Sequence, residues 1–512
     1  MRSPRPHLQD VVLVDVDADE ADPTLPGAAP DGHPPGNRPR SERPGPRTRG
    51  RSAARRWWPL AVGLVLLLFV AANSAITARD ERVRLAALAG VPGILAPLDG
   101  PVAEVWRSSL TSGSGLAASG GRLVGVDRGH DGQVDVVGLD PRTGETAWRV
   151  TARPPGPVDG WADCAVPEPA APSAPGAKDA ASAPVIACVV ADKVVITAED
   201  TAGYVFYPTA ARLVVIETTT GALVSDGPVE PSTTLTALGA DLVTSRIDDD
   251  GRAHLARTDA RGTTERWTFV SPEPVPIDDT RQRVASVTVR DGLIVVDAGP
   301  TWVLSADGEV LDTWTPGAST ELGGQVEVLR RGRLIAEPAS GVNGRAPGTR
   351  IIDLATGDSF TATGHPPFLM VDDGSLADLV LLRSSASEVL TAYDVATGRA
   401  RWTAPDSAGG GTAILDGRVL RTEAGELQAI DGGTGAVLWS TGIRQAAQSP
   451  LITDGRVVLL VDADAGRNPT LAAYGLDDGR LRWTTAASWD LYPFSLGRQL
   501  YGWTEQGLIR LD

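Results

Sequence analysis

The chain has 512 residues, and its 64 Asp and Glu outnumber its 47 Lys and Arg, giving a net charge of -17 and a pI near 4.8. So acidic a chain should repel nucleic acid, which excludes a nucleic-acid partner from the expected functions. The 57 Gly and 39 Pro favour many short strands joined by turns over a helical fold.

Residues 1–56 combine Pro, Gly and Arg with few large apolar side chains. Such a composition cannot bury enough apolar surface to offset the entropy lost on ordering, so a disordered cytoplasmic tail is expected. The short apolar run at residues 11–14 lies in an acidic stretch, and residues 38–56 are basic. The run either adds a strand to a partner protein or is a chance apolar patch.

Residues 57–77 carry no charge and are long enough to cross a bilayer as a helix. By the positive-inside rule, the arginines before this segment place the tail in the cytoplasm and the rest of the chain outside. The alternative is a cleaved signal peptide with small residues at 72–75, but the basic region before the apolar core is far longer than usual. A retained single-pass anchor is therefore predicted, and the flanking arginines are Arg47, Arg49, Arg51, Arg55 and Arg56.

Residues 78–101 are expected to form a short juxtamembrane connector. One or two helical turns over residues 83–88 would end at Pro92, Gly93 and Pro97, because Pro and Gly interrupt helices. The main domain is then predicted to begin near Val102 and to run to residue 512.

A short pattern recurs along this domain: Asp-x-x-Thr-Gly-x-x-x-Trp, as in Asp431, Thr434, Gly435 and Trp439. The Asp side chain can bond to the backbone of its own turn, the Gly can take the positive φ of a tight hairpin, and the Trp adds a large apolar surface. Other clear copies are Asp140, Thr143, Gly144 and Trp148; Asp394, Thr397, Gly398 and Trp402; and Asp477, Gly479 and Trp483.

Weaker copies surround Gly221, Gly262 with Trp267, Gly308 with Trp314, and Gly357 with Phe360 near the Trp position. From Gly221 onward the turn glycines are spaced by roughly 37 to 49 residues, the period of a four-stranded propeller blade. The predicted fold is therefore an all-β propeller spanning residues 102–512.

The two ends of this domain complement each other. Residues 102–106 resemble the Trp-bearing last strand of a blade, whereas residues 497–503 and 507–511 form a hairpin with no such strand after it. Pairing them would close the ring and remove its open edges. Hairpins can be placed at nine positions, but the region between Leu235 and Thr315 is expected to hold one incomplete unit. Eight blades are predicted, with seven or nine as alternatives.

Residues 153–184 are rich in Pro and Ala and interrupt the period, so a surface insertion is expected there, because a blade cannot hold many prolines in its ladder. Cys164 lies in this stretch and Cys188 follows it, and these are the 2 cysteines of the chain. In an exported domain, one disulfide between them that staples the insertion is the expected arrangement.

The repeated pattern resembles that of the PQQ-like (quinoprotein dehydrogenase-like) β-propellers over about residues 100–512. In that family the Thr-Gly turn and the Trp dock one blade on the next, and the fold serves dehydrogenases, outer-membrane assembly factors and sensor domains. PQQ alcohol dehydrogenases stack the quinone on a disulfide of adjacent cysteines, and this chain has no adjacent pair. No catalytic residue and no cofactor are therefore expected.

Metal and acid-base candidates are weak. The acidic turns at residues 248–251, 372–374 and 462–466 offer oxygen ligands for Ca²⁺, but none completes a calcium loop, and acidic Gly turns are common in hairpins. The histidines are not spaced as metal ligands: His7, His33, His130, His254 and His365. No metal site is predicted.

These observations favour a non-catalytic, membrane-anchored extracytoplasmic propeller of the bacterial cell envelope that binds a protein, an envelope polymer or another ligand. Two alternatives remain open. One is a membrane-tethered quinone-dependent oxidoreductase, and the other is a signalling protein that acts through its cytoplasmic tail. The oligomeric state is not predicted.

Overall fold

The computed structural model describes residues 69, 73–110, 115–129, 131–156, 159–168, 183–197, 204–207, 209–275, 284–315, 325–340, 347–384, 386–406, 410–444, 450–462, 468–488 and 490–512. The chain divides into two compact units, Met1–Ala75 and Ile76–Asp512. The fold described below is that of the second unit. The predictions for the tail at residues 1–56 lie outside the described residues.

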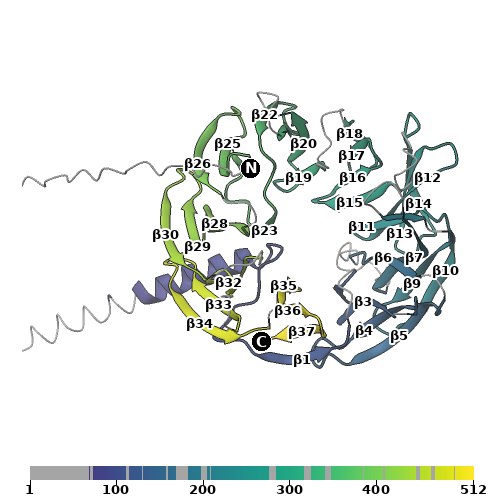
Figure 1. Ribbon diagram of the computed structural model, residues 1–512, viewed down its shortest axis with the longest axis horizontal. Helices are drawn as coiled ribbons and strands as arrows, with labels where there is room; N and C mark the ends of the chain where they lie inside the picture. The colour runs from purple at the N-terminus through teal and green to yellow at the C-terminus, as the bar shows by residue number, and fades with distance from the viewer. Residues whose placement is uncertain are drawn as a thin grey trace, which may run out of the picture. The chain divides into compact units, whose positions relative to one another are not determined.

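The second unit is a β-propeller in which the described strands form nine sheets around a common centre (Figure 1). Each sheet is here called a blade and numbered in chain order. Blade 1 contains β2 (Ala117–Ser119), β3 (Arg122–Arg128), β4 (Val134–Leu139) and β5 (Thr146–Arg153). Blade 2 contains β6 (Asp159–Ala165), β7 (Val185–Thr197), β9 (Ala211–Glu217) and β10 (Leu223–Val229), with β8 (Tyr204–Tyr207) paired to β7.

Blades 3 to 5 each have four antiparallel strands in sequence order. Blade 3 contains β11 (Thr234–Leu238), β12 (Asp241–Ile247), β13 (Ala253–Asp259) and β14 (Glu265–Val270). Blade 4 contains β15 (Ser286–Arg290), β16 (Leu293–Asp297), β17 (Thr301–Leu304) and β18 (Val310–Trp314). Blade 5 contains β19 (Glu327–Leu329), β20 (Leu334–Ser340), β21 (Pro347–Asp353) and β22 (Ser359–Thr363).

Blades 6 and 7 depart from this pattern. Blade 6 has β24 (Leu379–Ser384), β25 (Val389–Asp394) and β26 (Ala400–Pro405). The preceding strand, β23 (Leu369–Asp372), instead pairs in parallel with the first strand of blade 7. That first strand is β27 (Thr412–Leu415), and it is followed by β28 (Arg418–Glu423), β29 (Glu426–Asp431) and β30 (Val437–Gly442).

Blades 8 and 9 complete the ring. Blade 8 contains β31 (Ile452–Thr453), β32 (Val457–Asp462), β33 (Thr470–Gly475) and β34 (Leu481–Ala486). Blade 9 contains β35 (Tyr492–Leu496), β36 (Gln499–Thr504) and β37 (Gly507–Leu511), with β1 (Glu104–Ser108) as its outer strand. The pairing of β1 with β37 confirms the closure predicted from the two ends of the domain.

The core lies between the blades. Middle strands such as β4 and β32 are buried along their whole length, because neighbouring blades cover both of their faces. Outer strands such as β30 and β34 alternate between exposed and half-buried residues, since one face meets solvent. Apolar clusters therefore join consecutive blades, as where Leu390 and Trp402 of blade 6 meet Ile414 and Val419 of blade 7.

The preferred count of eight blades is wrong and the alternative of nine is confirmed, because the described strands form nine sheets. The region between Leu235 and Thr315, which was expected to be incomplete, holds two complete four-stranded sheets, blades 3 and 4. Only weak copies of the Trp motif occur there, so the motif alone did not indicate that both blades are complete.

Residues 153–184 are not wholly an insertion, because β6 lies within them and forms the inner strand of blade 2. The prolines of this stretch fall before Asp159 or after Ala165, which leaves the ladder of β6 intact. The predicted disulfide is confirmed: Cys164 and Cys188 are bonded and directly opposite in the register of β6 and β7. It joins two strands of one blade and closes the loop between them.

Residues 73–88 are helical, and residues 76–88 of this helix belong to the same unit as the blades. The segment that follows does not stand apart from the propeller, since Val91, Ile94 and Leu95 are buried in its apolar clusters. Among the described residues, no helix is both long and apolar enough to cross a membrane. Most of residues 57–77, where a span is predicted, lie outside the described part of the chain.

Candidate functional site

The repeated motif builds the turn between the third and fourth strands of a blade. In blade 7, Asp431 Oδ1 accepts hydrogen bonds from Thr434 N (2.8 Å) and Thr434 Oγ1 (2.7 Å), which hold the pKa of Asp431 below its ordinary value. Gly435 N donates to Asp431 O at 2.8 Å, and Gly435 has a φ of 76°. Asp394 and Thr397 make the same two contacts in blade 6, at 2.9 Å each.

The Trp of one blade packs on the Gly of the next blade's turn. A Cβ added at Gly435 would lie 2.6 Å from Cγ of Trp402, and the Trp402 Nε1 donates to Gly432 O at 2.7 Å. Because this contact leaves no room for a side chain, the Gly is required for docking as well as for its positive φ. Corresponding indole hydrogen bonds are Trp106 to Pro141 O, Trp148 to Thr218 O, Trp267 to Ala306 O and Trp439 to Leu476 O.

A one-residue bulge precedes the Trp position in most outer strands. Between Trp439 and Val437, for example, the register with β29 shifts by one residue. Blade 5 has no such shift in the pairing of β21 with β22, and the aromatic residue occurs one position earlier, as Phe360. Phe360 packs against Gly398 in place of a Trp. The missing bulge thus explains the shorter spacing from Gly357.

Two other motif positions are exceptional. Ser225 of β10 stands four residues after Gly221, where Trp would be, and its Oγ donates to Arg261 O at 3.4 Å. Trp483 packs at the edge of the cluster that joins blades 8 and 9. Blade 9 has no turn between its third and fourth strands, because β37 and β1 come from opposite ends of the domain. In these contacts the motif residues form turns and dock one blade on the next. None of the contacts brings together side chains that could carry out a reaction.

A second set of contacts holds the helix against one end of the propeller. This end is here called the turn face, because it carries the turns between first and second strands and between third and fourth strands. Glu81, Arg84, Leu85 and Leu88 are the less exposed residues of the last two helical turns, with the spacing of one helix face. Leu88 is buried, and a Cβ on Gly455 would lie 2.9 Å from its Cδ1.

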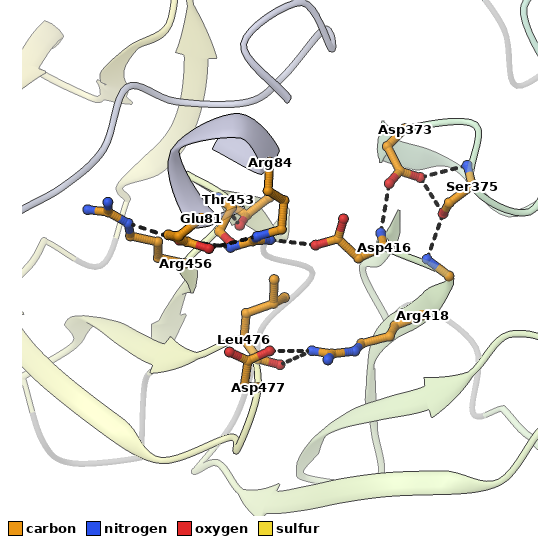
Figure 2. Close-up of polar contacts among 12 residues, drawn as sticks. Glu81, Arg84, Asp373, Ser375, Asp416, Arg418, Thr453, Arg456, Leu476 and Asp477 are labelled. Carbon is orange, nitrogen blue, oxygen red and sulfur yellow. Dashed lines mark hydrogen bonds and ion pairs between the residues drawn. The ribbon is translucent and has the colours of Figure 1, made fainter. Parts of the chain in front are cut away.

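A row of charged residues joins the helix to the hairpin turns of blades 7 and 8 (Figure 2). Arg84 Nη1 donates to Asp416 Oδ2 at 2.5 Å, and Arg84 Nε donates to Glu81 Oε2 at 2.9 Å. Arg456 Nε donates to Glu81 Oε1 at 3.3 Å, so the charges alternate along the row. The hydrogen bond with Arg84 lowers the pKa of Glu81, and the same bond raises the pKa of Arg84.

Asp416 is itself held in place by the segment that joins β23 to β24. Its backbone N donates to Asp373 Oδ2 at 2.7 Å, and Gly417 N donates to Ser375 Oγ at 2.7 Å (Figure 2). Asp416 has a φ of 52° and Gly417 of 73°, which is the backbone of a tight hairpin turn. The carboxylate that receives Arg84 is thus positioned by a rigid turn.

The chain continues from the helix across the turn face of blades 8 and 9. Leu95 N donates to Thr453 O at 2.9 Å, Ala96 N to Arg498 O at 2.7 Å, and Leu98 N to Asp454 Oδ2 at 2.8 Å. With these backbone bonds and the buried apolar residues, the helix and the following segment form a helix-docking site comprising residues 81–98. The sequence signal for this site was the helical spacing of its helix residues, Glu81, Arg84, Leu85 and Leu88. No sequence pattern indicated which residues of blades 7 and 8 they would contact.

The remaining candidates do not gather into a site. His254 Nε2 lies 2.6 Å from Asp248 Oδ2 within one hairpin of blade 3, and His365 pairs through its backbone with Arg383. His7, His33 and His130 lie outside the described residues, as does part of the acidic turn at 462–466. In the described part of the chain, no group of three or more His, Cys, Asp or Glu is placed to hold a metal ion.

Comparisons with known proteins found one matching family model and several similar solved structures. Residues 386–495 match the family model described as Outer membrane protein assembly factor BamB. Comparison with curated proteins gave no match. Among solved structures, BamB from Moraxella catarrhalis is similar, with 14% identity, a TM-score of 0.38, and coverage of 80% of this chain and 99% of that chain.

Two further solved structures are the computationally designed Ika8 protein and the C-terminal WD40 domain of Sif2. The first has 13% identity and a TM-score of 0.34, covering 82% of this chain and 99% of that chain. The second has 15% identity and a TM-score of 0.36, covering 60% of this chain and 91% of that chain. The match at residues 386–495 and the nine sheets whose turns repeat one docking motif support a resemblance to the PQQ-like β-propellers.

Proposed function

We propose that this chain is a protein-interaction module of the cell envelope, tethered to a membrane by residues 57–77 with its propeller on the extracytoplasmic side. The observation that carries the proposal is the helix-docking site. It ties the propeller firmly to the chain segment that leads back to residues 57–77. A rigid ring with loops at both ends, held beside a membrane, suits the capture of a protein partner.

Three further observations support this proposal. The match to a family described as an outer membrane protein assembly factor favours an envelope protein with protein partners. The Cys164–Cys188 disulfide favours an oxidising compartment. The arginines before residue 57 favour a cytoplasmic N-terminus.

The helix and residues 89–98 occupy part of the turn face beside blades 7, 8 and 9. A partner bound to the propeller therefore has the opposite end of the ring and the outer strands available to it. This opposite end, here called the loop face, carries the turns between second and third strands. We assign the partner to the loop face, because residues 81–98 already cover part of the turn face.

Crosslinking tests the interaction. The full chain is crosslinked mildly in cells, purified, and analysed for peptides joined to other proteins. Crosslinks from loop-face residues to one recurring partner are expected, and deletion of residues 1–50 should leave them unchanged. Recurring crosslinks that all arise from residues 1–50 would show that the tail carries the interaction, which would overturn the proposal.

Orientation is tested separately with single introduced thiols. The two native cysteines are bonded to each other, so the reagent reacts with the introduced cysteine and not with them. An impermeant thiol reagent applied to intact cells or spheroplasts should label Arg142→Cys on the propeller and leave His33→Cys unlabelled. The reverse labelling would place the propeller in the cytoplasm.

A further inference from the structure

At the junction between blades 4 and 5, the Trp of one blade does not pack on the turn Gly of the next blade as it does at other junctions of the ring. The residue four positions after Gly308, where Trp stands in other blades, is Asp312. Trp314 comes two residues later, and its Nε1 donates to Pro338 O on β20 instead of to a turn of blade 5. Accordingly, a Cβ added at Gly357 would meet nothing within 4 Å, unlike those at Gly308 and Gly435.

A pair of carboxyl groups occupies this junction. Glu337 of β20 is buried, with an exposed fraction of 3%, and its carboxyl group lies within hydrogen-bonding reach of Asp312 of β18. Two carboxyl groups can share a hydrogen bond only if one of them carries a proton. When Glu337 carries that proton, the pair links the two blades by a hydrogen bond.

One arginine completes the cluster. Arg350 Nη1 of β21 lies 3.1 Å from Glu337 Oε2, and Arg350 is opposite Thr361 of β22 in the sheet register. The charged groups that act on Glu337 are thus Asp312 from blade 4 and Arg350 from blade 5. With one shared proton, a single negative charge balances Arg350. Without it, two carboxylates on neighbouring blades face one guanidinium group.

The pKa of Glu337 is raised from an ordinary 4.5 to about 7. Burial of the side chain is the larger cause and repulsion from Asp312 the second, although Arg350 acts to lower the pKa. Because the folded state holds the proton more tightly than the unfolded state, this group stabilises the fold fully below pH 4.5. That contribution is lost as the pH rises through about 7.

We propose that the junction of blades 4 and 5 is a proton-dependent seam, closed tightly while Asp312 and Glu337 share a proton and loosened when the proton leaves. The apolar cluster of Val303, Ile335 and Trp314 keeps the two blades in contact in both states. The change is therefore a weakening of one junction and not an opening of the whole ring. It does not depend on the partner proposed above.

Hydrogen exchange measured by mass spectrometry on the full chain tests the seam. Peptides covering β18 and β20 are compared at pH 6 and pH 8, after correction for the intrinsic pH dependence of exchange. Protection at the seam should fall about tenfold at the higher pH, as expected when a group with a folded-state pKa of about 7 loses its proton between these two pH values. Peptides covering β30 and β32, where Trp439 docks on blade 8, should show no such fall.

Glu337→Gln removes the titrating group but keeps a hydrogen-bonding side chain of the same shape, so its seam protection should become independent of pH. If this variant does not fold, Asp312→Asn serves, because it leaves a single carboxylate with Arg350. Wild-type protection that is equal at both pH values would overturn the proposal. So would a pH dependence that survives unchanged in either folded variant.

Discussion

Trp402 of blade 6 lies directly over Gly435 in the turn of blade 7, and its indole N–H donates to Gly432 O at 2.7 Å. This relationship joins the two halves of the repeated motif, since the turn of one blade is the docking surface for its neighbour. It also makes the glycine necessary for two independent reasons, its positive φ and its lack of a side chain.

These two reasons can be separated with a matched pair of variants. Gly435→Ala and Gly357→Ala both place a side chain at a positive φ in a Thr-Gly turn, at 76° in each case. Each should lose about 1 kcal/mol of unfolding free energy from backbone strain. Gly435→Ala should lose about 1–3 kcal/mol more, because its Cβ meets the Trp402 ring. Chemical denaturation measures both, and equal losses would refute the docking role of the glycine.

The helix-docking site should depend chiefly on buried leucine. Leu88→Ala removes a side chain that is 5% exposed and is expected to cost about 2–4 kcal/mol of docking free energy. Limited trypsin digestion should then cleave faster after Arg82 and Arg84. Val83→Ala is the control on the opposite side of the helix, where Val83 is 63% exposed, and its digestion should match the wild type.

The ion pair between Arg84 and Asp416 should contribute less than the leucines. Both side chains are about a third exposed, so a double-mutant cycle of Arg84→Met and Asp416→Asn should give a coupling of about 0.2–1 kcal/mol. The coupling should shrink further in high salt because the charges are partly screened. A coupling energy larger than the docking free energy lost in Leu88→Ala would show that charge, and not apolar burial, dominates docking.

Removal of the disulfide should destabilise the propeller without changing its fold. The bond links residues 24 positions apart, and loss of a loop closure of this size is expected to cost about 3 kcal/mol. The double variant Cys164→Ala and Cys188→Ala should therefore unfold at lower denaturant concentration. Adding a reductant should shift the wild type toward the variant but leave the variant itself unchanged.

Asp259 should contribute to loss of stability in acid. Its partial burial acts to raise its pKa, but hydrogen bonds from Thr263 and Thr264 outweigh this and lower the pKa to about 2. A lowered pKa means that stability is present above the ordinary value of 3.8 and is lost as the pH falls toward 2. Asp259→Asn should flatten the pH dependence of unfolding in that range, and Thr263→Ala, which removes one donor, should shift it upward.

Local chemistry explains why several features could be predicted from the sequence. The contact between Asp431 and Thr434 and the positive φ of Gly435 involve neighbours in the chain, so residue types alone indicate the turn. Ring closure followed from strand halves at the two ends, and the disulfide followed from having two cysteines. Phe360 shows the limit of this reasoning, because the absent bulge that shifts it is a property of strand pairing.

The amino-acid sequence by itself determined the repeat, its hairpin turns, the closure by the first strand and the Cys164–Cys188 pair, because each rests on local spacing or on residue counts. Only the tertiary structure decided that there are nine blades, that Asp312 meets Glu337 at one junction, and that Arg84 reaches Asp416. These contacts join segments far apart in the chain, and their partners are selected by how the blades pack against one another and not by any pattern near each residue.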